Sequence, residues 1–271
     1  MEAEKGKPMR VVTLIENTAG CPELVCEHGL SFYIETGMHR ILFDAGQSDA
    51  FAQNAEKLNV DLGSVDFAVL SHGHYDHGGG LQKFLQINQT APVYLRRDAF
   101  LLHQNGQGKD IGLDPQLQAS DRLVFTGDTL QLAPGITLYS CNERARIVPT
   151  DSSGMSVTEE GHSRPDLFLH EQYLLIEESG KRICFSGCSH KGILNIMNWF
   201  APDVLFGGFH FMRIDPAGDG AARLDAAAKT LMRYPTAYYT GHCTGQEQFA
   251  YLKLQMGDRL QALSTGMCVE V

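Results

Sequence analysis

The stretch Ser71–Gly80, SHGHYDHGGG, places three histidines and one aspartate within six residues. It directly follows the apolar run 67–70, which predicts a buried strand, so these side chains lie where a strand ends. The first two histidines are two positions apart and point the same way in an extended chain. Neutral imidazoles and a carboxylate suit Zn²⁺, and also Fe or Mn. Two ligand pairs exceed what one ion needs from a single loop, which predicts a two-metal site with ions about 3.5–4 Å apart. The candidate ligands are His72, His74, Asp76 and His77.

The spacing His-x-His-x-Asp-His resembles the signature of the metallo-β-lactamase superfamily. This resemblance implies an α+β fold, a four-layer αβ/βα sandwich of two mixed β-sheets with helices on the outer faces. The upstream run Ile41–Gly46, ILFDAG, resembles that superfamily's first motif, a strand ending in aspartate. Asp44 would then orient a ligand loop or contact a metal. The alternative is a turn-forming aspartate before a glycine.

Four further stretches resemble one branch of the superfamily, the dihydropteroate-synthase-like branch. That branch takes its name from an archaeal enzyme that joins a dihydropterin to a ribosyl-aminobenzene phosphate. The stretches are Glu27–Ser31, Phe185–Gly192, Gly207–His210 and Gly241–Gly245. Members of one branch need not share a substrate.

By position, the resemblance implies that His72 and His74 bind a first metal, and Asp76 and His77 a second. His242 follows a late strand, as the superfamily's last histidine does, and would complete the second site. The alternative for this residue is a buried histidine near the end of the chain.

The middle of the pattern departs from the superfamily. Pro134–Cys141 has no histidine where the usual third one stands, and Ile183–Cys188 ends in cysteine where a bridging aspartate is usual. The Gly-Cys-Ser-His motif of the branch implies that His190 supplies the missing imidazole. Cys188 is expected to be a thiolate ligand, a group that supports a ligand, or a packing residue.

Four other residues are candidates for substrate contacts or chemistry. His210 follows an apolar strand and two glycines, and would bind metal, substrate or phosphate, or have a buried structural role. Glu27 and His28 match a branch motif and would contact the substrate, or form a structural hydrogen-bonded pair. Lys191 is a candidate contact for an anionic substrate, although most lysines are simply solvated.

The activity expected from this resemblance is that of a metal-dependent hydrolase with Asp76 and His210 as catalytic residues. It would act on a small, phosphorylated or pterin-like substrate through metal-activated water. Two divalent ions are expected, Zn²⁺ in first place, with Mn²⁺, Fe²⁺ or Mg²⁺ as alternatives. A transferase of the dihydropteroate-synthase-like type is the alternative activity.

Two further classes are less favoured. Flavodiiron oxidoreductases have glutamate where this chain has His74, and a flavodoxin-like domain that does not follow here. A non-catalytic ligand sensor remains open because the bridging aspartate is missing.

The elements that must position these residues alternate in a repeated order. In each half of the chain β-hairpins come first and strand–loop–helix units follow, which predicts two mixed sheets in a single domain over residues 1–271. The runs 123–126 and 130–139 flank a Gly-Asp turn and are predicted to form a hairpin. The polar segments near 97–121 and 142–165 are expected to be substrate-side loops.

The composition limits the classes of partner. A net charge of −10 argues against a general nucleic-acid or anionic-membrane surface, so a small-molecule substrate is expected. The charged N-terminus does not read as a signal peptide, and no apolar run is long enough to span a bilayer. Seven scattered cysteines without a Cys-x-x-Cys pair favour a cytoplasmic location with free thiols. The sequence makes no prediction of oligomeric state.

Overall fold

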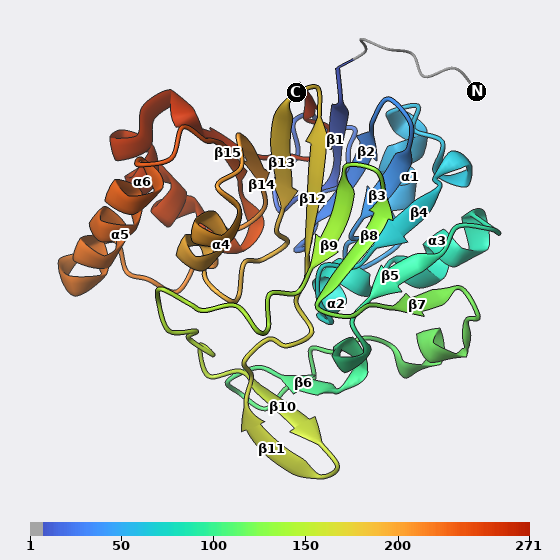
Figure 1. The fold of residues 1–271 in the computed structure, drawn as a ribbon, viewed down its shortest axis with the longest axis horizontal. Coiled ribbons are helices and arrows are strands. Elements are labelled where there is room, and N and C mark those ends of the chain that lie inside the picture. The colour runs from blue at the N-terminus through green and yellow to red at the C-terminus, as the bar shows by residue number, and fades with distance from the viewer. Residues whose placement is uncertain (1–7) are drawn as a thin grey trace.

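Two seven-stranded mixed sheets pack face to face in the computed structural model, which describes residues 8–271 (Figure 1). In spatial order, the first sheet consists of β17 (Cys268–Glu270), β1 (Arg10–Ile15), β2 (Ser31–Glu35), β3 (Arg40–Phe43), β4 (Phe67–Val69), β5 (Val93–Leu95) and β7 (Leu123–Phe125). The second consists of β16 (Leu260–Ala262), β15 (Ala237–Thr240), β14 (Val204–Phe206), β13 (Lys181–Phe185), β12 (Tyr173–Glu178), β9 (Ile136–Tyr139) and β8 (Thr129–Ala133).

Helices cover the outer face of each sheet. On the first sheet these are α1 (Ala50–Lys57) and α3 (Leu81–Ile87), and on the second α4 (Ile193–Phe200), α5 (Gly218–Leu231) and α6 (Gln246–Met256) (Figure 1). A short helix, α2 (Tyr75–Gly78), contains part of the histidine turn. Short 3₁₀ turns lie at Leu62–Ser64, Arg97–Phe100, Pro115–Ala119, His242–Thr244 and Gly257–Arg259.

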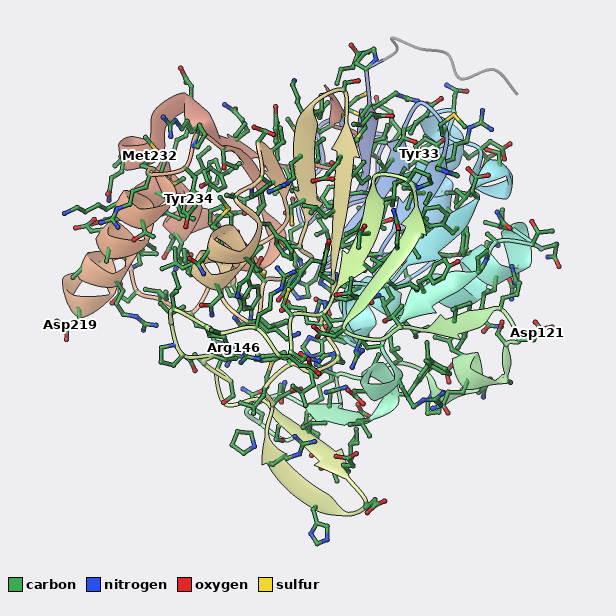
Figure 2. The ribbon with its side chains drawn as sticks, viewed as in Figure 1. Tyr33, Asp121, Arg146, Asp219, Met232 and Tyr234 are labelled. Atoms are coloured by element: carbon green, nitrogen blue, oxygen red, sulfur yellow. The ribbon has the colours of Figure 1, made fainter. Side chains whose placement is uncertain are left out.

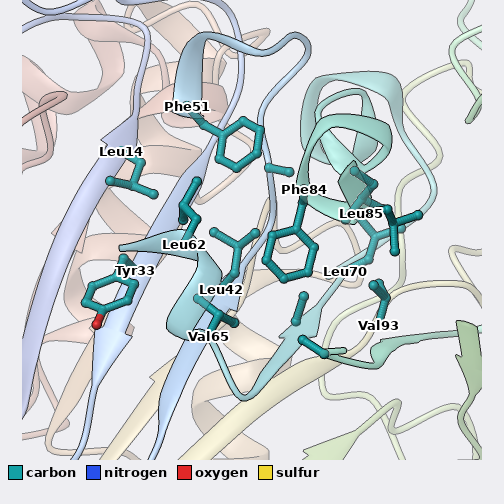
Figure 3. Close-up of a cluster of buried hydrophobic side chains, with 14 of the residues drawn as sticks. Leu14, Tyr33, Leu42, Phe51, Leu62, Val65, Leu70, Phe84, Leu85 and Val93 are labelled. Atoms are coloured by element: carbon teal, nitrogen blue, oxygen red, sulfur yellow. The ribbon is translucent and has the colours of Figure 1, made fainter. Parts of the chain in front are cut away.

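Three apolar layers hold this arrangement together. One lies between α1, α3 and the first sheet, where Phe51 and Phe84 pack onto strand residues such as Leu42 (Figure 3). The central layer fills the space between the sheets and includes Phe32 and Phe185. The third lies under α4, α5 and α6. Apolar residues on both faces of the strands explain the nearly unbroken hydrophobic runs of β3, β4 and β14, and the four layers are those that the fold class predicted.

The parallel parts of the two sheets determine where the loops meet. β3, β4 and β5 are parallel neighbours in the first sheet, and β13, β14, β15 and β16 are parallel neighbours in the second. The carboxyl ends of parallel strands lie at one edge of a sheet, which is where open α/β sheets usually place a site. The candidate ligands all follow such strand ends.

The hairpin predicted from 123–126 and 130–139 is wrong. β7 pairs in parallel with β5 in the first sheet, whereas β8 pairs with β9 in the second. The Gly127–Asp128 turn therefore connects the two sheets. The chain does turn here, but β7 pairs with β5, which lies earlier in the sequence, and not with the strand that follows the turn.

The two polar segments are more ordered than loops. β6 (Leu102–Gln104) lies in the first segment, and β10 (Ser156–Glu159) and β11 (His162–Pro165) form a hairpin in the second. β6 pairs with β10, and the three strands make a small separate sheet at the lower edge of the molecule (Figure 1). Arg146 lies on the stretch that runs past α4 toward this hairpin (Figure 2). No helix within residues 8–271 has both the length and the apolar character to cross a membrane.

Candidate metal centre

Four strand ends bring the candidate ligands together. The histidine turn follows β4, and His190, His210 and His242 follow β13, β14 and β15. The turn is tightly packed from behind: a Cβ on Gly80 would lie 2.2 Å from the carbonyl oxygen of Ala45. Only glycine permits this approach of two backbones.

The first group of ligands consists of His72, His74 and His190. All three side chains are buried, and their donor atoms lie within 4.8 Å of one another. The Nε2 atoms of His72 and His190 are 3.2 Å apart. His190 also stacks on the ring of Phe168, with 4.3 Å between the ring centroids, which fixes the plane of its imidazole.

The second group consists of Asp76, His77 and His242. The Nε2 atoms of His77 and His242 are 3.2 Å apart, and Asp76 Oδ2 lies 3.2 Å from His242 Nε2 and 3.7 Å from His77 Nε2. His28 approaches the same carboxylate oxygen at 3.3 Å from the more exposed side.

Cys188 lies between the two groups. Its Sγ is 3.2 Å from His77 Nε2, and it forms a compact cluster of donor atoms with His72 and His77. Burial is the main cause that raises the pKa of this thiol well above its ordinary value. A cation at this place would act in the opposite direction, because coordination deprotonates a thiol.

Hydrogen bonds to the far side of each ring assign the tautomers of three histidines. His77 Nδ1 donates to Asp44 Oδ2 at 2.7 Å, and His242 Nδ1 donates to Asn17 Oδ1 at 2.9 Å. His72 Nδ1 lies 2.8 Å from Ser71 Oγ, which itself donates to Asp44. The Nε2 atoms of these rings are therefore lone-pair acceptors.

The Nε2 atoms of His77 and His242, both acceptors in these tautomers, face each other at 3.2 Å. Facing acceptors 3.2 Å apart are unfavourable unless a proton or a cation lies between them. Histidines that bind metals commonly donate the other ring N–H to a carboxylate or carbonyl oxygen, as these do. His74 Nε2 and His190 Nδ1 are buried and have no hydrogen-bond partner among the described residues. The donor set thus fits two divalent cations.

The electrostatics of four of the rings favour neutral imidazoles. Burial is the main cause that lowers the pKa of His72, His74, His190 and His242. Burial also acts against the charged form of His77, but the carboxylates of Asp44 and Asp76 outweigh it and raise the pKa of that ring.

Left-handed backbone conformations concentrate at the centre. Asp44, Ser189, His210 and His242 have φ values of 59°, 60°, 56° and 48°. Such conformations cost about 1–3 kcal/mol at residues other than glycine and persist where the surrounding structure imposes them.

A cavity of about 500 Å³ opens beside the first group. His190 and His210 line it, together with Arg213 and Arg223, and Asp151 contributes from the second polar segment. Burial is the first cause, and Arg213 the second, that lowers the pKa of His210 to about 4. His210 is therefore neutral at pH 7 and faces the cavity.

Two of the residues expected at the substrate are placed elsewhere. Lys191 is fully buried, and its ammonium group donates to the carbonyl oxygens of Ser140 and Glu171 at 2.7 and 2.8 Å. Glu27 accepts from the backbone N–H groups of Gln47 and Ser48. Both have structural roles, because their polar atoms bind backbone groups. The alternative for Glu27 was a structural hydrogen bond, although with His28, whereas the alternative for Lys191 was a solvated side chain, which its burial contradicts. Of Glu27, His28 and Lys191, only His28 lies beside the candidate ligands, where its Nε2 is 3.3 Å from Asp76 Oδ2.

Several residues at the centre were not predicted. Glu171 accepts from the backbone N–H of His190 at 2.6 Å, and Glu16 accepts from that of His242. His170 lies behind the histidine turn, with its ring centroid 5.3 Å from that of His74. Its position shortly before β12 was a usable signal, because it is another histidine close to the start of a strand.

Comparisons with known proteins agree with this geometry. The family model of the metallo-beta-lactamase superfamily matches residues 24–117. The 7,8-dihydropterin-6-methyl-4-(beta-D-ribofuranosyl)-aminobenzene-5'-phosphate synthase of Methanocaldococcus jannaschii is 29% identical over 272 residues, which are 90% of this chain and 90% of that protein.

Two solved structures extend the comparison. The crystal structure of Tm1679, described as a metal-dependent hydrolase of the beta-lactamase superfamily, is 28% identical with a TM-score of 0.81, and the match covers 97% of this chain and 99% of that one. The metallo-beta-lactamase fold protein YhfI from Bacillus subtilis is 15% identical with a TM-score of 0.63, covering 97% and 100% of the two chains. The second likeness shows the fold alone.

Proposed function

This chain belongs to the metallo-β-lactamase superfamily, and on that premise we propose that it is a metal-dependent hydrolase of a small anionic substrate. The observation that carries the proposal is the convergence of imidazole nitrogens from opposite sheets, His72 with His190 and His77 with His242.

The ligands divide into two sets. His72, His74 and His190 would hold one cation, and Asp76, His77 and His242 the other. Cys188 is placed to contact either. Divalent ions in such a site acidify a water molecule toward neutral pH and polarise a carbonyl or phosphoryl oxygen.

The residues of the chain would do the remaining work. Asp44, Ser71 and Asn17 keep the far-side protons on the histidine rings, so that their Nε2 atoms stay available. Neutral His210 is placed to accept a hydrogen bond from a substrate or to relay a proton in the cavity.

The cavity supports a small anionic substrate. Its volume lies within the range of about 300–1,000 Å³ that is usual for small-molecule pockets. Its walls are mainly apolar. The charged side chains that line it are two guanidinium groups, Arg213 and Arg223, and one carboxylate, Asp151. A locally positive cavity in a chain of net charge −10 would concentrate a carboxylate or phosphate at this place.

A synthase is the second candidate. It is favoured by the similarity to the M. jannaschii enzyme, which is 29% identical over 90% of both chains. That enzyme's name specifies a phosphorylated aminobenzene product. The same cavity and cations would serve it, with the amino group of ribosyl-aminobenzene phosphate in place of water as the nucleophile and a dihydropterin that carries a leaving group on its 6-methyl carbon as the electrophile.

Metal analysis and activity assays test the proposal together. We expect the purified protein to hold two divalent ions, and His72→Ala combined with His74→Ala to lower this stoichiometry. Phosphodiesters, phosphomonoesters, lactones and esters are assayed with and without a chelator, and a dihydropterin is assayed with ribosyl-aminobenzene phosphate.

Chelator-sensitive hydrolysis is the result we expect. Condensation alone would replace the hydrolase by the synthase. Unchanged metal content in the double variant would contradict both.

A further inference from the structure

A buried polar cluster outside the proposed ligand sets connects the small sheet to the histidine turn. His103 lies on β6, Asp166 directly follows β11, and His170 is four residues further on. Their exposed fractions are 1%, 2% and 1%. None of the three has a part in the proposed chemistry, so burying them needs another explanation.

Polar contacts surround the ring of His103. Its Nδ1 lies 2.8 Å from Asp166 Oδ2, and its Nε2 lies 3.0 Å from the carbonyl oxygen of Asp98. Both ring nitrogens therefore lie against oxygen atoms that accept hydrogen bonds, which holds the ring in place. Asp166 also accepts from the backbone N–H of Phe168 at 2.6 Å, which holds its carboxylate in place.

His170 connects this pair to the turn. Its Nδ1 accepts from the backbone N–H of Gly73 at 2.8 Å, so this nitrogen carries no proton. The proton of the neutral ring is therefore on Nε2, which lies 3.3 Å from Asp166 Oδ2 without the alignment of a full hydrogen bond. Gly73 stands between the two ligands His72 and His74.

The surrounding backbone fixes the same turn. The backbone N–H of Gln172 donates to the carbonyl oxygen of Ser71 at 2.7 Å, and its side-chain amide donates to that of Leu70 at 2.9 Å. On the other side, a Cβ on Gly73 would lie 2.3 Å from the carbonyl oxygen of Ala99. The turn is thus enclosed by Gln172, directly before β12, and by Ala99, shortly before β6.

We propose that His103, Asp166 and His170 are positioning residues, which hold the Gly73 N–H and thereby direct the side chains of His72 and His74 toward the first cation. This inference rests on the proposed function, because it presupposes that these histidines bind metal. It assigns the small sheet a role in shaping the metal centre.

A further cation site is the rival explanation. Donor atoms of His74, His103, Asp166 and His170 lie within 4.8 Å of one another. The hydrogen bond from Gly73 argues against it: His170 could coordinate through Nε2 only as an imidazolate, since its Nδ1 accepts the hydrogen bond and carries no proton. Metal-binding histidines instead donate from that second nitrogen.

Two substitutions at His170 separate these roles. His170→Asn keeps an acceptor near the position of Nδ1 but lacks Nε2, whereas His170→Leu keeps volume and loses the acceptor. Zn²⁺ affinity is measured by competition with a chromophoric chelator, Co²⁺ coordination by its visible spectrum, and stoichiometry by elemental analysis. His162→Asn, an exposed histidine on β11 of the same sheet, is the control.

We expect His170→Asn and the control to bind Zn²⁺ nearly as tightly as the unmodified protein. His170→Leu should bind about 10–100-fold more weakly and show an altered Co²⁺ spectrum. If His170→Leu fails to fold, the isosteric Asp166→Asn is expected to show the same loss.

Three results would overturn the inference. The first is His170→Leu binding at least as tightly as His170→Asn, as a packing role would give. The second is the loss of one metal equivalent in His170→Asn, which would make the cluster a ligand set. The third is Asp166→Asn binding as tightly as the unmodified protein. An unmodified protein that binds no metal would instead overturn the proposed function.

Discussion

Asp44 determines the protonation of two imidazoles from one buried position. Its Oδ2 accepts from His77 Nδ1 and from Ser71 Oγ, which in turn contacts His72 Nδ1, while its Oδ1 accepts from the backbone N–H of Ser71 at 2.7 Å. An acceptor-only carboxylate keeps protons on the far side of both rings. One residue thus affects a ligand of each proposed cation.

Asp44→Asn tests this dependence. The amide has one acceptor oxygen in place of two, so one of the contacts must be lost, and we expect Zn²⁺ affinity to fall about 10–100-fold. Asp121→Asn, on an exposed residue far from the centre, is the matched control (Figure 2). Equal affinities for the two variants in a chelator competition would contradict this account.

The candidate ligands are positioned by strand ends and by the turns that follow them. β4 delivers the histidine turn, and β13, β14 and β15 deliver His190, His210 and His242 from the facing sheet. These turns approach other backbones too closely to accept side chains, which is why glycines are frequent in them. Gly73 is such a position.

Gly73→Ala is expected to destabilise the turn. The new methyl group would lie 2.3 Å from a carbonyl oxygen and 2.6 Å from the Cα of Ala99, and overpacking of this kind costs about 1–3 kcal/mol. Gly127→Ala adds the same methyl group at a turn with no neighbour within 4 Å and serves as the control. Urea unfolding of both variants measures the difference, and a Gly73→Ala variant as stable as the control would contradict the expected clash.

Elements were predictable from the sequence where a local pattern determined them. β3, β14 and β15 are short apolar runs bounded by turns, which is the local pattern of a buried strand. The pairing of β7 was not predictable in this way, because its neighbour β5 lies much earlier in the chain and the pairing leaves no local signal. The Gly-Asp turn after β7 instead indicated a hairpin.

The residues of the candidate site likewise differ in whether a local sequence pattern indicates them. His72, His74, Asp76 and His77 are visible because their spacing within one turn carries the chemistry. His103 and Asp166 are 63 residues apart in polar segments without periodicity, so nothing local indicates that they meet. The sequence also could not show that the ammonium group of Lys191 is enclosed by backbone carbonyls.

Charge buried on the small sheet makes the stability of the whole molecule depend on pH. Burial opposes the ionised form of Asp166, but the hydrogen bond to His103 and the close contact with His170 outweigh it and hold the pKa of this carboxyl well below its usual range. A carboxyl whose pKa is lower in the folded state contributes stability that is complete above its unfolded pKa of about 4. This contribution is lost as the pH falls below that value.

Asp166→Asn should therefore flatten the acid limb of the stability curve. We expect the free energy of unfolding to fall less between about pH 7 and about pH 3 in this variant than in the unmodified protein, because the titrating group is gone. Urea titrations at both values measure the two slopes. Identical slopes would show that Asp166 does not contribute.

Each proposed cation takes ligands from both halves of the chain, with Asp76 and His77 on one side and His242, more than 160 residues later, on the other. A bound ion would therefore cross-link the two halves of the sandwich, in addition to its chemical role. Ligands that bind only the folded form stabilise it in proportion to the logarithm of their concentration, by about 2.7 kcal/mol at 100 times the dissociation constant. Metal scarcity in the surroundings would then have two effects on this protein: it would abolish the proposed activity, and it would lower the stability of the contact between the two halves.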